Sequence, residues 1–457
     1  MSLPRYREYK DSRFDWIGEV PIHWSVAAAG HRYEVLLGKM LDEKRITGDH
    51  LAPYLRNADV QWDRINVENL PQMDFSGSDL ARYALTPGDL LVCEGGEVGR
   101  AAIWRGDVDE CYYQKALHRL RCRDAAKDLP RFMFYLLRAA SSLNVFTASE
   151  GKSTIAHLTA EALRSYRFAF PTFPEQQHIV GFLDHETGKI DALIAEQEML
   201  LALLAEKRQA TISHAVTRGL NPEAPMKDSG VGWLGKVPAH WEVSRVKRII
   251  WSIEQGWSPQ CENYPVEGPH EWGVLKVGCV NGGIFNSSEN KKLPPELEPI
   301  VEYSLRKGDL LISRANTREL VGSAAVVPED FENLLLCDKL YRLRVEADMC
   351  RPDFLSAYLA IRATRAQIEL DATGASSSML NIGQSVILEL LVPLPDVSEQ
   401  AAIMSFVSIE TSKLDTLKTE AERAIDLLKE RRSALIAAAV TGKIDVRQQP
   451  FALEAAA

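Results

Sequence analysis

Two long segments of the chain, residues 175–216 and 399–440, carry apolar side chains at the spacing of an α-helix, with charged residues between them. Neither segment contains proline, and their only glycines are Gly181 and Gly188. This pattern predicts two long amphipathic helices. At about 1.5 Å per residue, about 40 residues would span roughly 60 Å, so each helix needs an apolar partner along its length. We expect the two helices to form an antiparallel pair, and the alternative is that each is buried in a domain of its own.

The ends of both segments carry residues that start and stop helices. Pro174 and Pro395 end the preceding strands, and Ser398 is expected to be the N-cap of the second helix. Gly219 and Gly442 supply the stops. The apolar positions expected to hold the pair together are Ile190, Leu193, Leu200, Leu204, Leu414, Leu417, Leu428 and Leu435.

The rest of the chain alternates short apolar runs with glycine and proline, which is typical of strands and turns. Each part also has one helical pattern, at residues 130–140 and 352–363, and each pattern opens with proline. The expected fold class is α+β, with two mixed α/β domains separated by the coiled-coil-like helix pair. The expected boundaries are 1–174 for the first domain, 175–221 for the first long helix, 222–398 for the second domain, 399–445 for the second long helix and 446–457 for a tail.

The chain also repeats itself. Lys10-Asp11-Ser12 and Pro21-Ile22-His23-Trp24 return 217 positions later as Lys227-Asp228-Ser229 and Pro238-Ala239-His240-Trp241. Glu175-Gln176 and Lys189-Ile190-Asp191 return 224 positions later as Glu399-Gln400 and Lys413-Leu414-Asp415. Both ends of a unit are therefore duplicated, which predicts a protein with two-fold pseudo-symmetry. The repeated His23 and His240 each lie in a Pro-x-His-Trp turn, so we interpret them as structural.

The two units share framework positions and differ in the loops between them. Residues 54–60 align with 274–280, the Gly-Asp-Leu-Leu turn at 88–91 with 308–311, and 114–121 with 338–344. Cys93 to Glu97 in the first unit stands where the second has Ser313 to Arg318. Arginine, asparagine and threonine in one loop are the residue types that contact phosphates and base edges. The candidate DNA contacts are Arg56, Asn57, Lys115, Lys276, Arg314, Asn316, Thr317, Arg318 and Lys339, and the alternative is a solvated surface with ordinary ion pairs.

One further loop, Gly151-Lys152-Ser153-Thr154, resembles the end of a phosphate-binding loop. The complete nucleotide-binding pattern needs glycine where Phe146 stands, and the second unit has Gly374-Ala375-Ser376-Ser377 without lysine. These loops are suited instead to contact a DNA phosphate through hydroxyl and backbone N–H groups, which adds Lys152, Ser153, Thr154, Ser376 and Ser377 to the candidates. No metal-ligand spacing and no nucleophile elbow is present in the sequence, so a binding protein is favoured over an enzyme.

Composition restricts the class of protein further. The hydrophobic fraction of 46% and charged fraction of 25% are ordinary for a globular protein. No apolar run is long enough for a membrane span, and the first residues lack a signal-peptide pattern. The seven cysteines include no C-x-x-C pair and are expected to be reduced thiols in a cytoplasmic protein. The net charge of −10 argues weakly against nucleic acid, although the charge of one face matters more than the total.

The duplicated motifs resemble a known family. Lys-Asp-Ser followed by Trp-x-Gly-x-Val-Pro-x-His-Trp opens each half, and Pro-x-x-Glu-Gln-x-x-Ile-x-x-Phe opens each long helix. Together with the closing Ala439 to Asp445, they look like the specificity subunit of type I restriction-modification systems, over essentially the whole chain. The first copy departs from the closing motif at residues 217–221.

The resemblance implies a DNA-recognition subunit without a catalytic site or cofactor of its own. Each mixed domain would read one half of a bipartite double-stranded DNA sequence, and the helices would set the spacing between the halves. The helices would also bind two modification subunits, which carry S-adenosylmethionine and methylate adenine. Restriction (motor-nuclease) subunits, which use ATP and magnesium, would join through them. The competing hypotheses are a scaffold that joins two proteins without reading DNA, and an NTPase or nuclease that uses residues 151–154.

Overall fold

The computed structural model describes residues 3–40, 47–146, 157–376 and 379–449. The chain divides into two compact units, and each combines parts that are distant in sequence. Unit 1 contains residues 1–198 and 423–457, and unit 2 contains residues 199–422. The boundaries fall inside two long helices, α5 (Phe173–Arg218) and α9 (Val397–Val440), so each unit contains one part of each helix.

Unit 1 is built on a four-stranded antiparallel sheet in the order β10-β9-β12-β4. Unit 1 also contains a three-stranded sheet, β11-β5-β8, in which the pair β11–β5 is parallel. The strands of these and of three two-stranded sheets are β1 (Tyr9–Asp11), β2 (Glu19–Pro21), β3 (Ser25–Ala28), β4 (Tyr33–Leu37), β5 (Leu51–Leu55), β6 (Val60–Gln61), β7 (Arg64–Ile65), β8 (Gln72–Asp74), β9 (Leu90–Cys93), β10 (Ala101–Ile103), β11 (Tyr112–Tyr113), β12 (Leu117–Cys122) and β13 (Arg167–Phe170).

Unit 2 repeats this plan. Its four-stranded sheet β23-β21-β25-β17 has the same antiparallel pairing as β10-β9-β12-β4, and β18–β24 is the parallel pair. The strands are β14 (Met226–Asp228), β15 (Lys236–Pro238), β16 (Glu242–Arg245), β17 (Ile250–Gln255), β18 (Gly273–Leu275), β19 (Asn290–Lys292), β20 (Ser304–Leu305), β21 (Leu310–Ser313), β22 (Ala315–Asn316), β23 (Ala324–Val326), β24 (Phe331–Leu335), β25 (Leu340–Val345), β26 (Thr373–Ser376), β27 (Met379–Asn381) and β28 (Leu391–Leu394). The α+β class and the internal repeat are confirmed.

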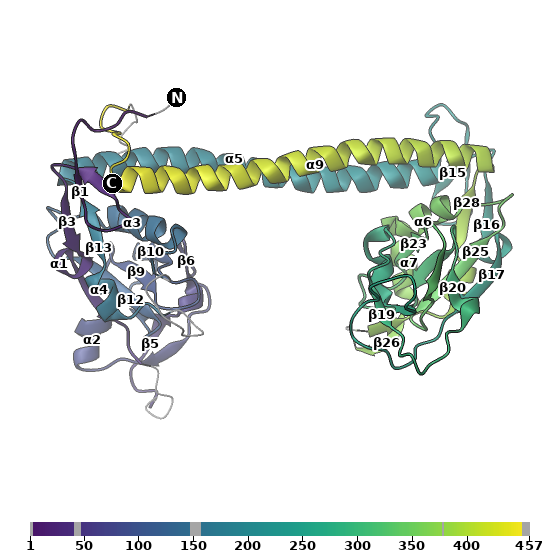
Figure 1. The fold of residues 1–457 in the computed structure, drawn as a ribbon, viewed down its shortest axis with the longest axis horizontal. Helices are drawn as coiled ribbons and strands as arrows, with labels where there is room; N and C mark the ends of the chain where they lie inside the picture. The colour runs from purple at the N-terminus through teal and green to yellow at the C-terminus, as the bar shows by residue number, and fades with distance from the viewer. Residues whose placement is uncertain (1–2, 41–46, 147–156, 377–378, 450–457) are drawn as a thin grey trace. The chain divides into compact units, whose positions relative to one another are not determined.

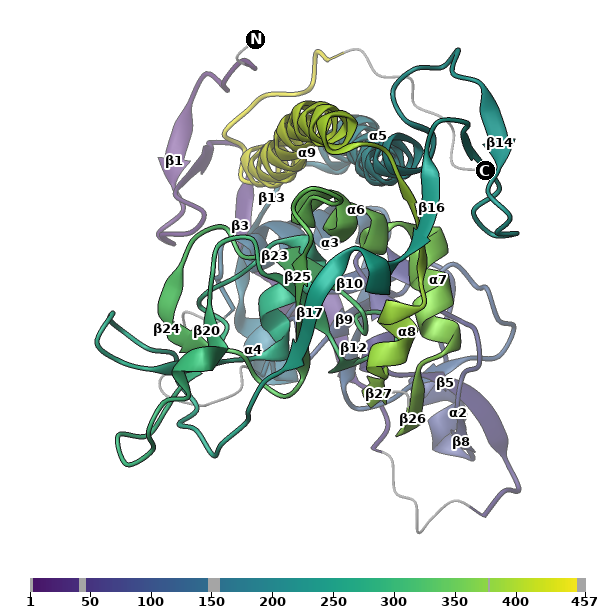
Figure 2. The same cartoon turned by 90° about the vertical axis from the view of Figure 1, so that its right-hand side faces the viewer.

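Helices cover one face of each four-stranded sheet. In unit 1, α3 lies between the sheet and the long helices (Figure 1), and in unit 2 α6 has the same place (Figure 2). The helix predicted over 352–363 stops earlier, because Ile361 is extended and a second helix follows it. The shorter helices are α1 (Ala29–Arg32), α2 (Ser78–Tyr83), α3 (Pro130–Ser142), α4 (Ala160–Ser165), α6 (Pro352–Ala360), α7 (Arg362–Leu370) and α8 (Gln384–Leu388).

The long helices form within a few residues of their predicted bounds, but the predicted cap of α9 was wrong. The Asp396 carboxylate, not Ser398, accepts the backbone N–H of Glu399 at 2.8 Å. It also accepts the Ser398 hydroxyl at 2.6 Å, and these bonds hold the pKa of Asp396 below its ordinary value. Asp396 is the favoured N-cap because a carboxylate at a helix N-terminus interacts with the helix dipole as well as with the free N–H group.

Buried and partly buried positions recur along each long helix at alternating intervals of four and three residues. In α5 the buried or partly buried series is Leu183, Thr187, Ile190, Ile194, Gln197, Leu201, Leu204 and Arg208. In α9 the series 224 positions later is Val407, Thr411, Leu414, Ala421, Ile425, Leu428 and Arg432, with Lys418 exposed. This is the heptad repeat of a coiled coil, and it has the same phase in both copies.

The heptad corrects part of the predicted interface. Ile190, Leu204 and Leu414 are buried, and Leu428 and Leu435 are partly buried. Leu193, Leu200 and Leu417 were predicted in the interface, but they are 45%, 39% and 47% exposed. Each lies one position before a member of the series (Ile194, Leu201 and Lys418), and the series itself includes polar residues such as Thr187 and Gln197. Hydrophobicity alone therefore selected neighbouring leucines instead.

Each unit pairs its two helix parts through the same ion pair. In unit 1, the Arg432 guanidinium binds the Asp191 carboxylate, and in unit 2 Arg208 binds Asp415 at 2.6 Å. Arg208 and Arg432 occupy equivalent positions, as do Asp191 and Asp415. The helices run antiparallel within each unit. Leu183 near the start of α5 shares a core with Ala439 near the end of α9, and Ala215 near the end of α5 shares one with Ile403 near the start of α9.

A carboxylate in the first turn of each long helix fixes the helix to the repeated His-Trp turn. Glu175 is bound by the His23 ring at 2.9 Å, the Trp24 indole at 3.2 Å and the Tyr6 hydroxyl at 2.8 Å. In unit 2, Glu399 is bound in the same way by His240 at 2.9 Å and Trp241 at 3.1 Å. The structural interpretation of the two histidines therefore has a physical basis.

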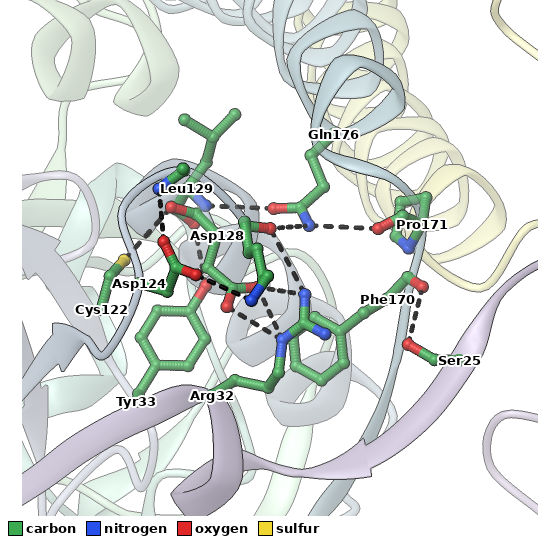
Figure 3. Close-up of polar contacts among 12 residues, drawn as sticks. Ser25, Arg32, Tyr33, Cys122, Asp124, Asp128, Leu129, Phe170, Pro171 and Gln176 are labelled. Carbon is green, nitrogen blue, oxygen red and sulfur yellow. Dashed lines mark hydrogen bonds and ion pairs between the residues drawn. The ribbon is translucent and has the colours of Figure 1, made fainter.

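The next residue, a fully buried glutamine, joins the same turn of helix to the mixed domain. The Gln176 amide accepts the Leu129 N–H and donates to the carbonyls of Lys127 and Pro171, beside the Arg32–Asp128 ion pair (Figure 3). Gln400 has the matching contacts in unit 2, with Arg351 N–H and the carbonyls of Met349 and Pro395. These bonds satisfy buried backbone groups at both helix starts.

The glycine that ends each helix is required by its neighbours. Gly442 has a φ of +72°, and a Cβ there would lie 2.4 Å from Cδ of Pro21. Gly219 has a φ of +74° and packs against Trp241. The turn after Gly442 also contacts the segment before β1, where the Asp445 N–H donates to the Pro4 carbonyl at 2.8 Å.

The cysteines and the helices bear on two expectations from composition. All seven cysteines lie in the described ranges and none is in a disulfide; burial raises the pKa of Cys337 to about 12. Within the described part of the chain, no helix has both the length and the apolar character that a membrane span needs.

The heptad predicts which substitutions weaken the helix pair. Ile190→Ala removes apolar atoms from a position that is 4% exposed, and it should cost about 2–5 kcal/mol of unfolding free energy. Leu193→Ala, three residues away and 45% exposed, should change it by no more than about 0.5 kcal/mol. Urea unfolding followed by circular dichroism measures both, and an equal loss in the two variants would contradict the observed seam.

Candidate nucleic-acid interface

The loops that carry the predicted contacts leave a sheet in which arginines bind buried aspartates. In unit 1, Arg121 on β12 binds Asp89, the residue just before β9, at 2.6 Å. In unit 2, Arg344 on β25 binds Asp309 at 2.7 Å in the equivalent place. Each aspartate also accepts a backbone N–H in the turn before it. The Gly-Asp-Leu-Leu turn is thus a framework element, and its charges are used inside the fold.

A second arginine on each central strand is almost completely buried. Arg342, 1% exposed, binds the Glu254 carboxylate and donates to the carbonyls of Ser304 at 2.8 Å and Glu302 at 2.9 Å. Its counterpart Arg119 binds Glu34 at 3.2 Å. These basic side chains are therefore structural.

In unit 1, Asn57 connects the loops at one edge of the sheet. Its amide nitrogen donates to the Gly95 carbonyl at 2.9 Å and more weakly to that of Ala116 at 3.5 Å. Its amide oxygen accepts the Arg100 guanidinium at 2.8 Å. The loops after β5 and β9 and the loop before β12 therefore meet at Asn57. Lys115, exposed in the last of these loops, lies beside this meeting point.

Arg56 is less available than the sequence indicates. Its guanidinium binds the buried Asp59 carboxylate at 2.8 Å, and that bond raises the pKa of Arg56 above its ordinary value. Lys39, at the end of β4, is held similarly by Asp79 at 2.7 Å. Both cations are partly neutralised before any ligand binds.

In unit 2, Asp338 connects the corresponding loops. Its carbonyl accepts the Gln255 amide at 3.1 Å and the Arg314 guanidinium at 3.4 Å, and its carboxylate accepts the Ser258 hydroxyl. The loop after β18 joins the same edge, because Asn316 donates to the Asn281 amide oxygen at 3.3 Å. The same edge of the repeated sheet thus gathers the variable loops in both units.

The structure brings the candidates of each unit together, with different surroundings. Thr317 and Arg318 are exposed beside Asn316, and Lys339 is exposed next to Asp338. Lys276, at the end of β18, is partly buried. Whether these residues contact DNA stays a prediction. Lys152, Ser153, Thr154 and Ser377 lie outside the described residues, as does the side chain of Ser376.

Sequence reasoning missed two residues that shape the loop of unit 2. Asn281 is exposed in the turn that meets Asn316, and no charge or motif marked it in the sequence. Arg365 on α7 donates to the Glu319 carbonyl at 2.9 Å and so supports the loop from below. Its guanidinium is desolvated, which lowers the pKa of Arg365 from its ordinary value. The alternation of apolar positions on α7 could have placed it, but its partner is a backbone group that no sequence pattern indicates.

Metal-ion chemistry has no evident place among these loops. Among the described residues, no group of three or more histidine, cysteine, aspartate and glutamate side chains is arranged to hold a metal ion. What the loops offer is amide, hydroxyl, guanidinium and ammonium groups, which are the donors and acceptors that contact bases and phosphates.

Comparison with known proteins gives similarities that point to the same kind of protein. Residues 44–198 match the model of the type I restriction modification DNA specificity domain. The chain is 27% identical over 225 residues to the type I restriction enzyme EcoEI specificity subunit of Escherichia coli; this match covers 49% of the chain and 38% of that subunit. It is 20% identical over 437 residues to the StySPI specificity subunit of Salmonella potsdam, covering 93% of the chain and 90% of the subunit. The chain thus matches well under two thirds of the EcoEI subunit.

A solved structure has the same fold. It comes from work on complex assembly and conformational transition of the type I R-M system, with a TM-score of 0.69 and 17% identity. The match covers 92% of this chain and 98% of that chain.

The buried and exposed arginines of unit 2 should differ sharply on substitution. Arg342→Lys cannot replace the guanidinium contacts with Glu254, Ser304 and Glu302, so it should cost about 1–3 kcal/mol of unfolding free energy. Arg318→Lys should stay within about 0.5 kcal/mol, because Arg318 is exposed. Thermal and urea unfolding compare the two, and a large loss in the Arg318 variant would show that its loop is structural.

Proposed function

We propose that this chain is a specificity subunit of a type I restriction-modification system and that it reads a DNA sequence in two separate halves. Each mixed domain reads one half. The observation that carries the proposal is the repeated framework, in which one edge of the same sheet gathers unlike loops at Asn57 in unit 1 and at Asp338 in unit 2. Identical frames with different polar loops suit two different half-sites better than one symmetric ligand.

The chain acts as a reader, and the chemistry belongs to its partners. Two modification subunits, each with S-adenosylmethionine, would methylate the DNA that the chain selects. Restriction subunits with ATP and magnesium would add cleavage. The long helices would dock the modification subunits and set the distance between half-sites. With these partners, the complex would act on DNA in the cytoplasm.

The rival hypothesis of a scaffold without DNA readout explains the helix pair but gives no reason for the divergent edge loops. The other rival, an NTPase or nuclease that uses residues 151–154, concerns residues outside those described. Absence of ATP turnover by the purified chain would remove it.

Co-expression with a type I modification subunit from the same genome tests the proposal directly. Sequencing of the methylated host DNA should reveal a new two-part adenine motif that disappears when this chain is omitted. Exchanging residues 25–170 for the first domain of a related subunit should change one half of that motif and leave the other half unchanged. If no motif appears although the complex assembles, or if both halves change together, the proposed division of labour is wrong.

The surface of the long helices indicates how two copies of one partner would dock. In unit 1, Leu193 of α5 and Leu427 of α9 are 45% and 56% exposed. In unit 2, the residues related to them by the shift of 224 are Leu417 and Leu203, and they are 47% and 56% exposed. Each unit therefore presents an equivalent pair of apolar side chains outside the seam, which suits one modification subunit per unit.

Charged substitutions at these leucines should therefore remove partners one at a time. Leu193→Asp with Leu427→Asp should leave a complex with one modification subunit, and adding Leu203→Asp and Leu417→Asp should leave none. Native mass spectrometry counts the subunits. Leu370→Asp, at the end of α7 and 77% exposed, is the matched control and should keep both. Full assembly of the fourfold variant would exclude this docking surface.

A further inference from the structure

A cavity of about 280 Å³ opens in unit 2 beside Asp338. It lies among the loop after β17, the end of β18, strand β19 and the loop before β25. Its polar lining includes Lys276, Lys291 and Lys339, together with Ser258 and Asp338. A volume several times the roughly 30 Å³ of one water molecule leaves room for a tetrahedral anion and its hydration.

Three lysine residues line this cavity. Among the described residues, none of Lys276, Lys291 and Lys339 is in an ion pair, whereas the adjacent Lys292 binds Glu271 at 2.6 Å. The acidic side chain in the lining is Asp338, and its carboxylate already accepts the Ser258 hydroxyl. Three like charges around one hollow repel each other, and an anion in the hollow would relieve that repulsion.

In unit 1, the basic residue equivalent to Lys276 is Arg56, and its charge is neutralised by a neighbouring carboxylate. The backbone makes the same turn in both units, with the Asp59 N–H bound to the Arg56 carbonyl and the Cys279 N–H bound to the Lys276 carbonyl, each at 3.1 Å. In unit 1, Asp59 supplies a carboxylate to Arg56. In unit 2, the residue equivalent to Asp59 is Cys279, which is fully buried and carries no carboxylate. Lys276 thus lacks the partner that its counterpart has.

The cavity also adjoins the variable loop of unit 2. Lys339 follows Asp338, whose carbonyl accepts the Arg314 guanidinium. Lys276 begins the turn that leads to Asn281, which is bonded to Asn316. An anion in the cavity would therefore lie next to the residues best placed to contact base edges.

We propose that Lys276, Lys291 and Lys339 bind a backbone phosphate of the DNA in this cavity and thereby fix the register of unit 2 on its half-site. This inference rests on the proposed function. Phosphate contacts orient a protein on the duplex without reading sequence, so the cavity positions and the neighbouring loop selects. Unit 1 has no equivalent trio among its described residues at this edge, because Arg56 and Lys39 are already paired.

The test uses the complex with the modification subunit and duplexes that contain or lack its methylation motif. The variant with Lys276→Ala, Lys291→Ala and Lys339→Ala should bind about tenfold more weakly at moderate salt, by a similar factor on both duplexes. Its plot of log affinity against log salt concentration should be shallower by about one to two units. The corresponding triple arginine variant should keep the slope, which separates charge from packing. Lys292→Ala is the matched control and should keep affinity and slope.

The outcomes separate the two proposals. If the wild-type complex prefers its motif and the triple alanine variant has an unchanged slope, the phosphate site is wrong and the reading function stands. A triple variant that methylates a different half-site would also overturn the phosphate site, because the lysines would then read bases. If the wild-type complex shows no preference for any motif, the proposed function itself fails.

Discussion

The packing of α5 against α9 is the constraint on which the rest of the structure depends. Each helix contributes buried side chains at alternating intervals of four and three, and the two series are related by 224 positions. Fully burying one leucine or isoleucine is worth about 1.5–3 kcal/mol, so several per unit outweigh the polar positions among them. Because the pattern has the same phase in both copies, either helix can serve as partner to the other. Arg432–Asp191 in unit 1 and Arg208–Asp415 in unit 2 are the same contact made twice.

Two adjacent side chains in the first turn of each long helix attach that helix to its mixed domain. Glu175 and Glu399 accept the indole of the repeated tryptophan, and Gln176 and Gln400 join the same helical turn to the loop before α3 or α6. The glutamines are fully buried, so an unmade bond there would cost about 1–3 kcal/mol. Such contacts allow little change, whereas the loops at the far edge of the sheet are free to differ. The division between a fixed frame and variable loops therefore follows from where the buried polar groups lie.

The sequence was sufficient for the class of fold, the repeat and both long helices, because these rest on periodicity and on duplicated motifs. It was insufficient for the phase of the seam, since Thr187, Gln197 and Arg208 occupy seam positions while Leu193 and Leu200 lie outside. The alignment of the two units also predicted that Arg56 and Lys276 are equivalent basic candidates for DNA contact. Asp59, three residues from Arg56, is close enough in sequence to indicate the local ion pair. The hollow beside Lys276 depends on Lys291 and Lys339, which only the tertiary fold brings together.

The acidic net charge illustrates why totals mislead for a protein of this kind. Asp59, Asp89 and Asp309 are buried, and each carboxylate is bound by a guanidinium, so these charges are balanced inside the frame. Lys276, Lys291 and Lys339 contribute only three of the 53 basic side chains, yet they gather at one hollow. A phosphate at that place responds to the charges within about 10 Å, which is the Debye length near 0.1 M salt, and not to carboxylates elsewhere on the chain. Net charge of −10 and a local anion site are therefore compatible, and the salt dependence of binding reports the local charge.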